Sequence, residues 1–324
     1  MEGGHVPVLL RETLELLVPP EPDSLMIDAT LGLAGHASAF LERYPRLRLI
    51  GVDADAEVQA IAKARLVPYG DRVRLVHAFF DDFFADWRTA GERPGIVLFD
   101  FGVSMYHFRE ARRGFSLTGD EALDMRLDTG TGRSASDLVN DLDERELSKL
   151  LEDNGEEPFA RRIAQAIVRE RRASPIDSAR RLADIVRGAV PAKARYGRIH
   201  PATRTFQALR IAVNDELGRI GRVLGDAIEC LAPDGVIGAI SFHSLEDRIV
   251  KLAFRERAVR PVRGSFKGRD DTPIPETGAK RGLRLVTKKP VAPADDETSA
   301  NPASRSAKLR VARAVDPVAP APGR

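Results

Sequence analysis

The sequence predicts an α/β protein with a doubly wound parallel sheet, and two neighbouring stretches carry most of that prediction. An apolar run, Leu25–Ile27, stops at Asp28 and is followed by a loop of small residues and then by a helical stretch that begins near Gly35. A second apolar run, Leu47–Val52, ends in Asp53, which lies 53 − 35 = 18 positions after Gly35. A strand, a tight loop that opens a helix, and an acid that closes the next strand form the first half of a nucleotide-binding unit.

The small-residue loop favours a nucleoside over a dinucleotide. A dinucleotide fingerprint has the form Gly-x-Gly-x-x-Gly, because the backbone must touch a pyrophosphate. After Gly32, the second and third glycine positions of that pattern hold Ala34 and Ala37. The remaining Gly-x-x-Gly suits a nucleoside with a cationic or zwitterionic tail, such as S-adenosylmethionine, and Asp53 can accept hydrogen bonds from both ribose hydroxyls. A plain strand–turn–helix without a ligand is the alternative.

Helices and strands continue to alternate after Asp53, as a doubly wound sheet requires. The pattern predicts a helix over 56–70, a strand over 72–80, a mixed aromatic stretch over 81–91, a strand over 95–101 and a fifth strand over 236–242. The segments 283–291 and 307–315 are candidates for a closing pair of strands.

More than a hundred residues separate the fourth and fifth predicted strands, far more than one crossover needs. Their pattern is mostly helical over 106–198, and a long helix over Thr203–Leu231 precedes the fifth strand. We therefore expect a discontinuous core domain over 1–105 and 200–315, an inserted helical substrate-recognition domain over 106–199, and a disordered tail over 316–324. The insertion begins beyond the carboxyl end of a strand, where ligands of such sheets bind.

Composition narrows the function class. The chain has 324 residues, of which 43% are hydrophobic and 30% charged, enough for a full core. No apolar run approaches the ~20 residues of a membrane span, and the first residues lack a secretory pattern, so we expect a cytoplasmic protein without a membrane partner. Cys230 is the only cysteine, which excludes an internal disulfide. The histidines lack metal-site spacing, so we expect no catalytic metal.

The charges are unevenly distributed. Residues 120–157 hold 13 acids and 4 bases, a net charge of −9. Residues 161–204 hold 12 bases and 3 acids, a net of +9, and residues 255–289 hold 11 bases and 4 acids, a net of +7. Two basic blocks on a chain of net charge +2 indicate an anionic partner, with nucleic acid as the leading candidate and a merely solvated helix face as the alternative.

Asp100 is the candidate catalytic residue, because it interrupts an otherwise apolar strand beside the predicted cofactor loop. An acid there can accept a hydrogen bond from a reacting exocyclic amine, whose lone pair is otherwise delocalised into the base, and positioning supplies most of the remaining rate enhancement. The alternative is that Asp100 caps the following turn. Methylation at a ring carbon would instead need a cysteine nucleophile, and Cys230, at a helix end, is better explained as a small buried hydrophobe.

The chain resembles the bacterial ribosomal RNA small-subunit N4-cytosine methyltransferase family, which acts on a decoding-site cytosine. Eight short motifs match in order over about 300 residues. They are HVPVLLRETLELL at 5–17, DATLGLAGH at 28–36, FDFGVS at 99–104, RRGFSL at 112–117, LDMRLD at 123–128, HPATRTFQALRIAVNDEL at 200–217, ISFHSLEDRIVK at 240–251 and the NP…RSAKLR segment at 301–310.

The resemblance implies an S-adenosylmethionine-dependent class I fold with an inserted helical domain. It also implies direct methyl transfer to the N4 amine of a cytosine in small-subunit (16S) ribosomal RNA, with the assembled subunit as the expected partner and a homodimer left open. Asp100 and Ser104 are the implied catalytic residues. The implied cofactor contacts are Ala34, Gly35, His36, Asp53, Phe80, Asp100 and His107.

Three departures from the family pattern stand beside the implied site. The cofactor loop is poorer in glycine and has Leu31 and Leu33 in place of an aromatic and a basic residue. Met105–His107 replaces a Ser-Pro-Gln, and Phe101 stands where leucine is usual. Two other functions stay open on the sequence. One is a DNA amino-methyltransferase, against which the missing Pro-Pro-Tyr motif argues, and the other is a cofactor-sensing RNA-binding factor without turnover.

Overall fold

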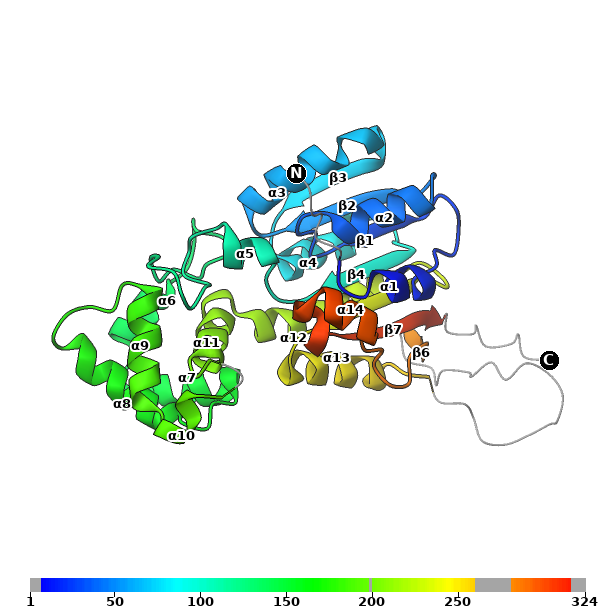
Figure 1. Cartoon of the computed structure of the whole chain (residues 1–324). Helices are drawn as coiled ribbons and strands as arrows, with labels where there is room; N and C mark the ends of the chain where they lie inside the picture. Colours follow the sequence, from blue (N-terminus) through cyan, green and yellow to red (C-terminus); the bar gives the residue numbers. More distant parts are fainter. Residues whose placement is uncertain (1–6, 198–199, 260–280, 316–324) are drawn as a thin grey trace, which may run out of the picture. The chain divides into compact units, whose positions relative to one another are not determined.

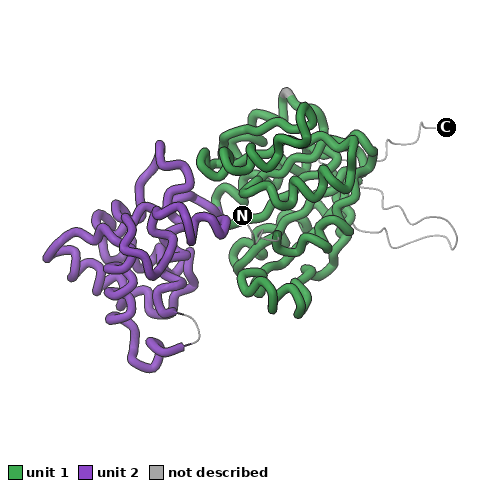
Figure 2. Tube along the Cα trace, turned by 45° about the horizontal axis from the view of Figure 1, so that its top comes forward, with its two compact units in different colours: residues 1–102, 218–324 green, residues 103–217 purple. Residues whose placement is uncertain are grey.

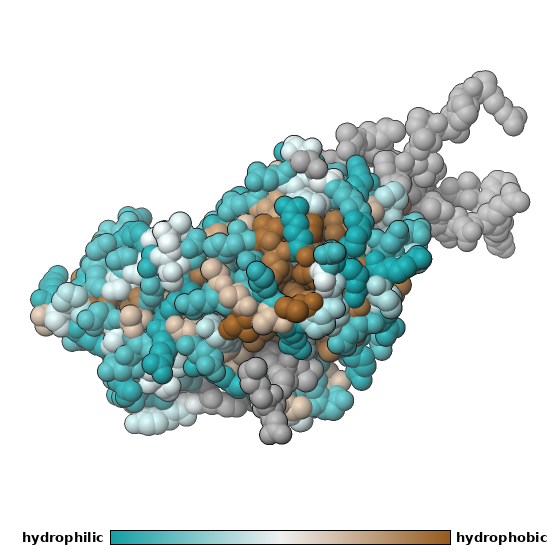
Figure 3. All heavy atoms as spheres, turned by 90° about the horizontal axis from the view of Figure 1, so that it is seen from above, coloured by the Kyte–Doolittle hydropathy of each residue, from teal (hydrophilic) through white to brown (hydrophobic). Residues whose placement is uncertain are grey.

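The computed structural model describes residues 7–197, 200–259 and 281–315. The chain divides into two compact units, Met1–Gly102 with Gly218–Arg324, called the sheet unit here, and Val103–Leu217, called the helical unit (Figure 2). The predicted tail at 316–324 and most of the basic stretch after Arg255 lie outside the described residues. Hydrophilic residues cover most of the face that Figure 3 shows.

The sheet unit holds seven strands in the order β3-β2-β1-β4-β5-β7-β6 (Figure 1). Five strands are parallel, and β7 pairs antiparallel with both β5 and β6. The strands are β1 Leu25–Asp28, β2 Arg48–Asp53, β3 Val73–His77, β4 Ile96–Asp100, β5 Val236–Ser241, β6 Gly282–Leu285 and β7 Lys308–Val315. The predicted fold class is confirmed, as is the closing pair of strands.

Successive side chains of these strands enter two different cores, because a strand places alternate residues on opposite faces. In β4, Val97 and Phe99 pack on one face, while Ile96 and Leu98 pack on the other. The first face is covered by α4 (Phe80–Ala90), α12 (Glu216–Cys230) and α13 (Ser244–Glu256). The second is covered by α1 (Leu10–Leu16), α2 (Gly35–Arg43) and α3 (Ala56–Leu66). A parallel sheet buried on both faces explains the continuous apolar runs of the sequence.

The aromatic stretch at 81–91, predicted as mixed, is the helix α4 in the structure. Its Phe83 and Phe84 are buried against the sheet. Two further short helices, η1 (Val67–Arg72) and α14 (Asp295–Ala300), precede β3 and η2 (Pro302–Ser306), respectively.

The helical unit is built around its own apolar core. Its helices are α5 Met105–Arg109, α6 Ala135–Asp141, α7 Glu144–Gly155, α8 Ala160–Arg171, α9 Ala179–Ala189, α10 Ala192–Arg195 and α11 Thr203–Asn214. Capping boxes begin α6 at Ser134 and α7 at Asp143, as the polar residues before each apolar pattern dictate.

The long helix predicted over Thr203–Leu231 is wrong, because the structure has two helices there, α11 and α12. Asp215 takes a left-handed conformation with φ of 49°, which ends α11. The side chain of the preceding Asn214 is held by the main chain of a distant loop, since it accepts from Leu127 N–H at 2.9 Å and donates to Met125 O at 2.8 Å. α11 packs on α7 and belongs to the helical unit, so the units divide after Leu217, where the sequence predicted a boundary at 199.

We predict that Asn214→Ala lowers the free energy of unfolding by about 1–3 kcal/mol, because it leaves a buried N–H and carbonyl without their partner. Chemical denaturation followed by circular dichroism measures the change. The control Lys149→Ala removes a solvent-screened ion pair with Asp153 and should leave the free energy of unfolding nearly unchanged. Equal stability of the two variants would contradict the assignment.

Candidate functional site

Three aspartates end neighbouring parallel strands at one edge of the sheet: Asp28 in β1, Asp53 in β2 and Asp100 in β4. The register pairs Asp28 with Gly51 of β2 and with Leu98 of β4. Asp53 therefore lies two residues beyond the partner of Asp28 in β2, and Asp100 lies two residues beyond its partner in β4. The carboxyl edge of a parallel sheet is where ligands bind in such folds, and three acids gathered there make it the candidate site.

The loop after β1 is shaped by backbone conformation and tied to the end of β2. Gly32 and Ala34 have φ of 51° and 59°, the left-handed region that a side chain disfavours. Leu31 N–H donates to Val52 O at 2.9 Å, and Gly32 N–H donates to Asp53 Oδ2 at 2.8 Å. Gly35 opens α2 and must lack a side chain, because a Cβ would lie 2.4 Å from Pro7 Cγ. Ala34, Gly35 and Asp53 are thus brought together.

The departure at Leu31 is a core contact. The side chain is 3% exposed and lies over β2, where a Cβ added to Gly51 would sit 2.8 Å from it. Leu31 therefore forms part of the packing beneath the loop.

Asp53 ties the loop to the end of β2. Its Oδ2 accepts from Gly32 N–H and its Oδ1 accepts from Asp55 N–H at 2.9 Å. Each carboxylate oxygen has two lone pairs and can take part in more than one hydrogen bond. A carboxylate at this place suits the adjacent hydroxyls of a ribose.

Asp100 carries the clearest sign of a binding site. Its Oδ1 is buried, and it has no hydrogen-bond partner in the described part of the chain. Its Oδ2 lies 3.7 Å from Nε2 of His36, a 6% exposed residue in the first turn of α2. The Asp100 main-chain N–H is fixed by Thr30 Oγ1 at 2.6 Å. A carboxylate oxygen that the fold leaves unsatisfied is expected to meet a donor from a ligand.

The pKa values of two carboxyl groups at this edge are raised. Burial, followed by the repulsion of Asp28 and Glu246, raises the pKa of Asp100 to about 8. Burial, together with the repulsion of Asp53, raises the pKa of Asp28 to about 7, against a hydrogen bond from Thr30 N–H that lowers it. Perturbed carboxyl groups in one place are typical of functional sites, and a cationic ligand would relieve their repulsion.

Glu246 and His243 extend the site from the end of β5, and sequence reasoning gave them no role. Glu246 is fully buried, and its Oε2 accepts from Phe242 N–H at 2.7 Å. Its Oε1 lies 3.1 Å from Nε2 of His243, and the two residues form the capping box that starts α13. The signal that could have found Glu246 is its position three residues after a polar N-cap at a strand end.

Phe80 begins α4 and presents an aromatic surface next to this edge. Its ring packs edge-on against Phe99 and Phe101, each with a centroid distance of 5.8 Å. The neighbouring Phe79 ring lies under the guanidinium of Arg219 at 3.6 Å, and Arg219 is paired with Asp81. These contacts fix the start of α4 to α12.

Ser104 and His107, both predicted site residues, belong to the helical unit. Ser104 is the N-cap of α5 and accepts from Tyr106 N–H at 3.2 Å. His107 is 4% exposed, and its ring lies 5.2 Å from the ring of Phe115. Within their unit both have structural contacts, and their functional roles stay predictions.

Cys230 is buried, and burial raises the pKa of its thiol to about 11. The expectation that it is a small buried hydrophobe is confirmed, since such a thiol is a poor nucleophile at neutral pH.

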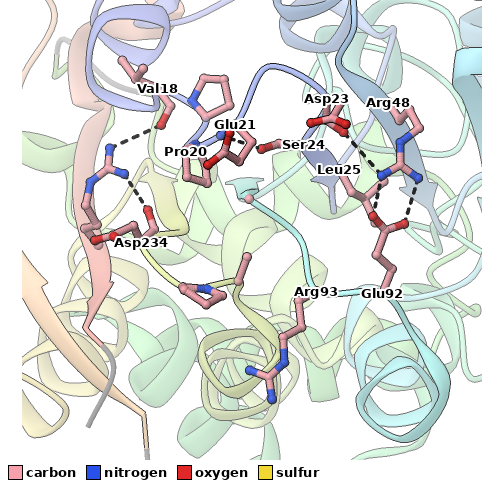
Figure 4. Close-up of a pocket in the computed structure, with 15 residues that line it drawn as sticks. Val18, Pro20, Glu21, Asp23, Ser24, Leu25, Arg48, Glu92, Arg93 and Asp234 are labelled. Atoms are coloured by element: carbon pink, nitrogen blue, oxygen red, sulfur yellow. Dashed lines mark hydrogen bonds and ion pairs between the residues drawn. The ribbon is translucent and has the colours of Figure 1, made fainter. Parts of the chain in front are cut away.

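A pocket of about 740 Å³ opens at the amino-terminal edge of the sheet, opposite the aspartates (Figure 4). Its arginines are engaged by the protein. Arg48 donates to Glu92 at 2.8 Å, and Arg313 donates to the carbonyls of Asp234 at 2.5 Å and Val18 at 3.3 Å. These contacts close turns between strands and helices, and they account for the polar lining of the pocket.

Comparison with known proteins identifies the family. A family model described as the MraW methylase family matches residues 2–315. The chain belongs to the MraW methylase family. This methylase is an enzyme, and S-adenosyl-L-methionine is its methyl donor. In the residues that the structure describes, no helix has the length and apolar character needed to cross a membrane.

Curated relatives of this methylase are similar over nearly their whole length. A protein of Treponema denticola is 47% identical, with 98% of this chain and 99% of that protein covered. Proteins of Heliobacterium modesticaldum and Saccharopolyspora erythraea are 45% and 44% identical, with 96% of this chain and 98% and 93% of those proteins covered. All three carry the name ribosomal RNA small subunit methyltransferase H.

We predict that this methylase loses stability as pH rises from about 5 to about 8. The raised pKa values of Asp28 and Asp100 mean that the folded state binds more protons than the unfolded state in that range, so their ionisation opposes folding. Asp28→Asn should flatten the slope and be the more stable protein at pH 8, by a few kcal/mol at most, since one pKa unit is about 1.4 kcal/mol. Denaturant titrations at several pH values measure this, and parallel curves for both proteins would contradict it.

Proposed function

We propose that this methylase transfers the methyl group of S-adenosyl-L-methionine to the N4 amine of a decoding-site cytosine in small-subunit (16S) ribosomal RNA. The proposal is supported by the family, by the name that its relatives carry, and by the chemistry of the carboxyl edge. An amine is the favoured methyl acceptor because of Asp100 at the end of β4. Its buried Oδ1 has no hydrogen-bond partner among the described residues and could accept a hydrogen bond from the amine.

The residues of the carboxyl edge fit the methyl donor. Asp53 ends β2 beside the loop, and its carboxylate oxygens would accept from the ribose hydroxyls. A Cβ at Gly32 would find only Thr30 O, at 3.9 Å, so the space in front of the loop is open. Phe80 would pack against the adenine, and Ala34, Gly35 and His36 would line the side of the loop. The donor supplies an electrophilic methyl group on a sulfonium, whose positive charge the acids favour.

Asp100 orients the amine and removes its proton. A hydrogen bond from N4–H to the carboxylate favours a pyramidal nitrogen whose lone pair points at the methyl carbon. As the bond between N4 and the methyl carbon forms, the bond between sulfur and that carbon breaks, leaving S-adenosylhomocysteine. The extra proton on N4 passes to Asp100, whose raised pKa makes it a competent acceptor once ionised. No covalent intermediate with the enzyme is required.

The remaining predicted residues and partners complete the proposal. Ser104 is proposed to help hold the amine, and His107 to contact the cofactor, both as the family motifs imply. The substrate is proposed to be the assembled small subunit in the cytoplasm, with the base splayed out of the folded RNA to reach the methyl group.

The discriminating experiment offers labelled S-adenosylmethionine with small subunits, naked 16S ribosomal RNA or DNA, and identifies the labelled nucleoside. Label in N4-methylcytidine of ribosomal RNA is the expected result. Label in DNA would favour a DNA amino-methyltransferase, and RNA binding without label would favour a factor without turnover. Either would overturn the proposal.

We predict that Asp100→Asn lowers the rate of methylation at least about 100-fold, because the amide cannot accept the proton from N4. Affinity for S-adenosylmethionine, measured by calorimetry, should also fall because Asp100 is proposed to face the cation, but by less than the methylation rate. A methylation rate close to that of the unaltered protein would remove Asp100 from the mechanism.

We predict that Asp53→Ala weakens binding of S-adenosylmethionine about 10- to 100-fold, since hydrogen bonds to a charged group contribute about 1.5–3 kcal/mol. Calorimetric titration measures the affinity, and a thermal melt checks that the loop change leaves the fold intact. The matched control is Asp71→Ala, an exposed aspartate before β3, which should bind as the unaltered protein does. Equal affinities of the two variants would contradict the ribose assignment.

A further inference from the structure

The helical unit contains a long stretch without acidic residues. Between 185 and 214 the sequence holds six lysines and arginines and no aspartate or glutamate. The stretch runs from the end of α9 through α10 into α11. A stretch that carries only positive charges attracts polyanions.

Tyr196, in the middle of this stretch, is 89% exposed. The other large apolar side chains that are exposed in the described residues are less so, with Val67 next at 70%. An almost fully exposed aromatic ring at the end of a helix gains little from the fold and is accessible to a binding partner.

The turn that carries Tyr196 is held in place. The preceding Arg195 donates from Nε to Val190 O at 3.1 Å and from a terminal nitrogen to Gly188 O at 3.0 Å. Ala194 N–H donates to Pro191 O at 2.8 Å. Because Arg195 ties the turn to the end of α9, the ring is presented from a fixed backbone, which lowers the entropy lost when it binds.

Basic side chains lie at the same end of the helical unit. The start of α9 is bound to the end of α8, since Arg181 donates to Ser174 O at 2.9 Å, so the end of α9 lies near the start of α8. The start of α11 is bound to the end of α7, since Arg204 donates to Glu156 O at 2.9 Å. α7 leads directly into α8, so Lys193, Tyr196 and Arg204 share one end of the unit.

Lys193 is exposed and has no ion-pair partner among the residues that the structure describes. Arg204 is exposed as well; its guanidinium donates to Glu156 O, and the carboxylate of Glu157 lies within electrostatic range of it. The acids at this end lie on the last turn of α7 and just after it, beside Arg204.

We propose that Tyr196 stacks on an unpaired base of the RNA substrate while Lys193 and Arg204 contact the phosphates beside that base. This rests on the proposed function, and it names the surface by which the helical unit recognises RNA. Aromatic stacking on splayed bases, flanked by cations, is the general mode by which proteins bind single-stranded RNA. A protein partner would instead be expected to meet several apolar side chains gathered around the ring.

The test compares Tyr196→Ala with Tyr196→Phe in steady-state methylation of small subunits. The alanine variant should raise KM about tenfold, with kcat and affinity for S-adenosylmethionine unchanged, because stacking contributes about 1–3 kcal/mol per base. The phenylalanine variant keeps the ring and should match the unaltered protein. Val67→Ala, an exposed apolar position in the sheet unit, is the matched control and should have no effect.

A binding assay separates this proposal from the proposed function. Fluorescence anisotropy with a labelled single-stranded fragment of 16S ribosomal RNA needs no turnover, so loss of affinity in Tyr196→Ala supports stacking even if methylation fails. Tyr196→Trp should bind the fragment, and the added tryptophan fluorescence should be quenched on binding. Unchanged affinity of Tyr196→Ala for RNA, or a defect seen only with subunits that carry their proteins, would overturn the proposal.

Discussion

The parallel pairing of β1, β2, β4 and β5 is the constraint on which the rest of this methylase depends. Their register brings Asp28, Asp53 and Asp100 to one edge, beside the loop that opens α2. The same pairing buries both faces of the sheet, so Asp28 is shielded from water and the Asp100 side chain is only 27% exposed. The fold therefore concentrates negative charge at this edge. Among the residues that the structure describes, Asp100 has one ionic contact, with His36 Nε2 at 3.7 Å.

The repulsion between the carboxyl groups at this edge affects both the stability of the fold and the binding of a ligand. Burial and mutual repulsion raise the pKa values of Asp28 and Asp100 to about 7 and about 8. A protein optimised only for stability would pair or remove such carboxyl groups. A sulfonium and an ammonium group on the methyl donor would relieve the repulsion, so the repulsion between these carboxyl groups would favour the binding of a cation.

The sequence predicts the sheet well because its strands are apolar runs that stop at acids. Asp53 and Asp100 could be named from the sequence since each closes such a run, and the loop glycines follow from the same strand–loop–helix pattern. Charge interactions between elements could not be predicted, because the effect of Glu246 on Asp100 exists only once β4 and β5 are paired. The break at Asp215 was also missed, since a helical pattern runs through it and the left-handed residue follows an Asn214 held by a loop far away in sequence.

The most direct measurement of the central claim is the proton balance of cofactor binding. Calorimetric titration near pH 7.5 in two buffers of different ionisation enthalpy gives the number of protons released when S-adenosylmethionine binds, with S-adenosylhomocysteine as a ligand that lacks the sulfonium charge. We expect greater proton release with S-adenosylmethionine, and a smaller difference between the two ligands in Asp28→Asn and Asp100→Asn. Equal proton release for both ligands in the unaltered protein would contradict the claim that buried carboxyl groups at the strand ends form the site for the cation.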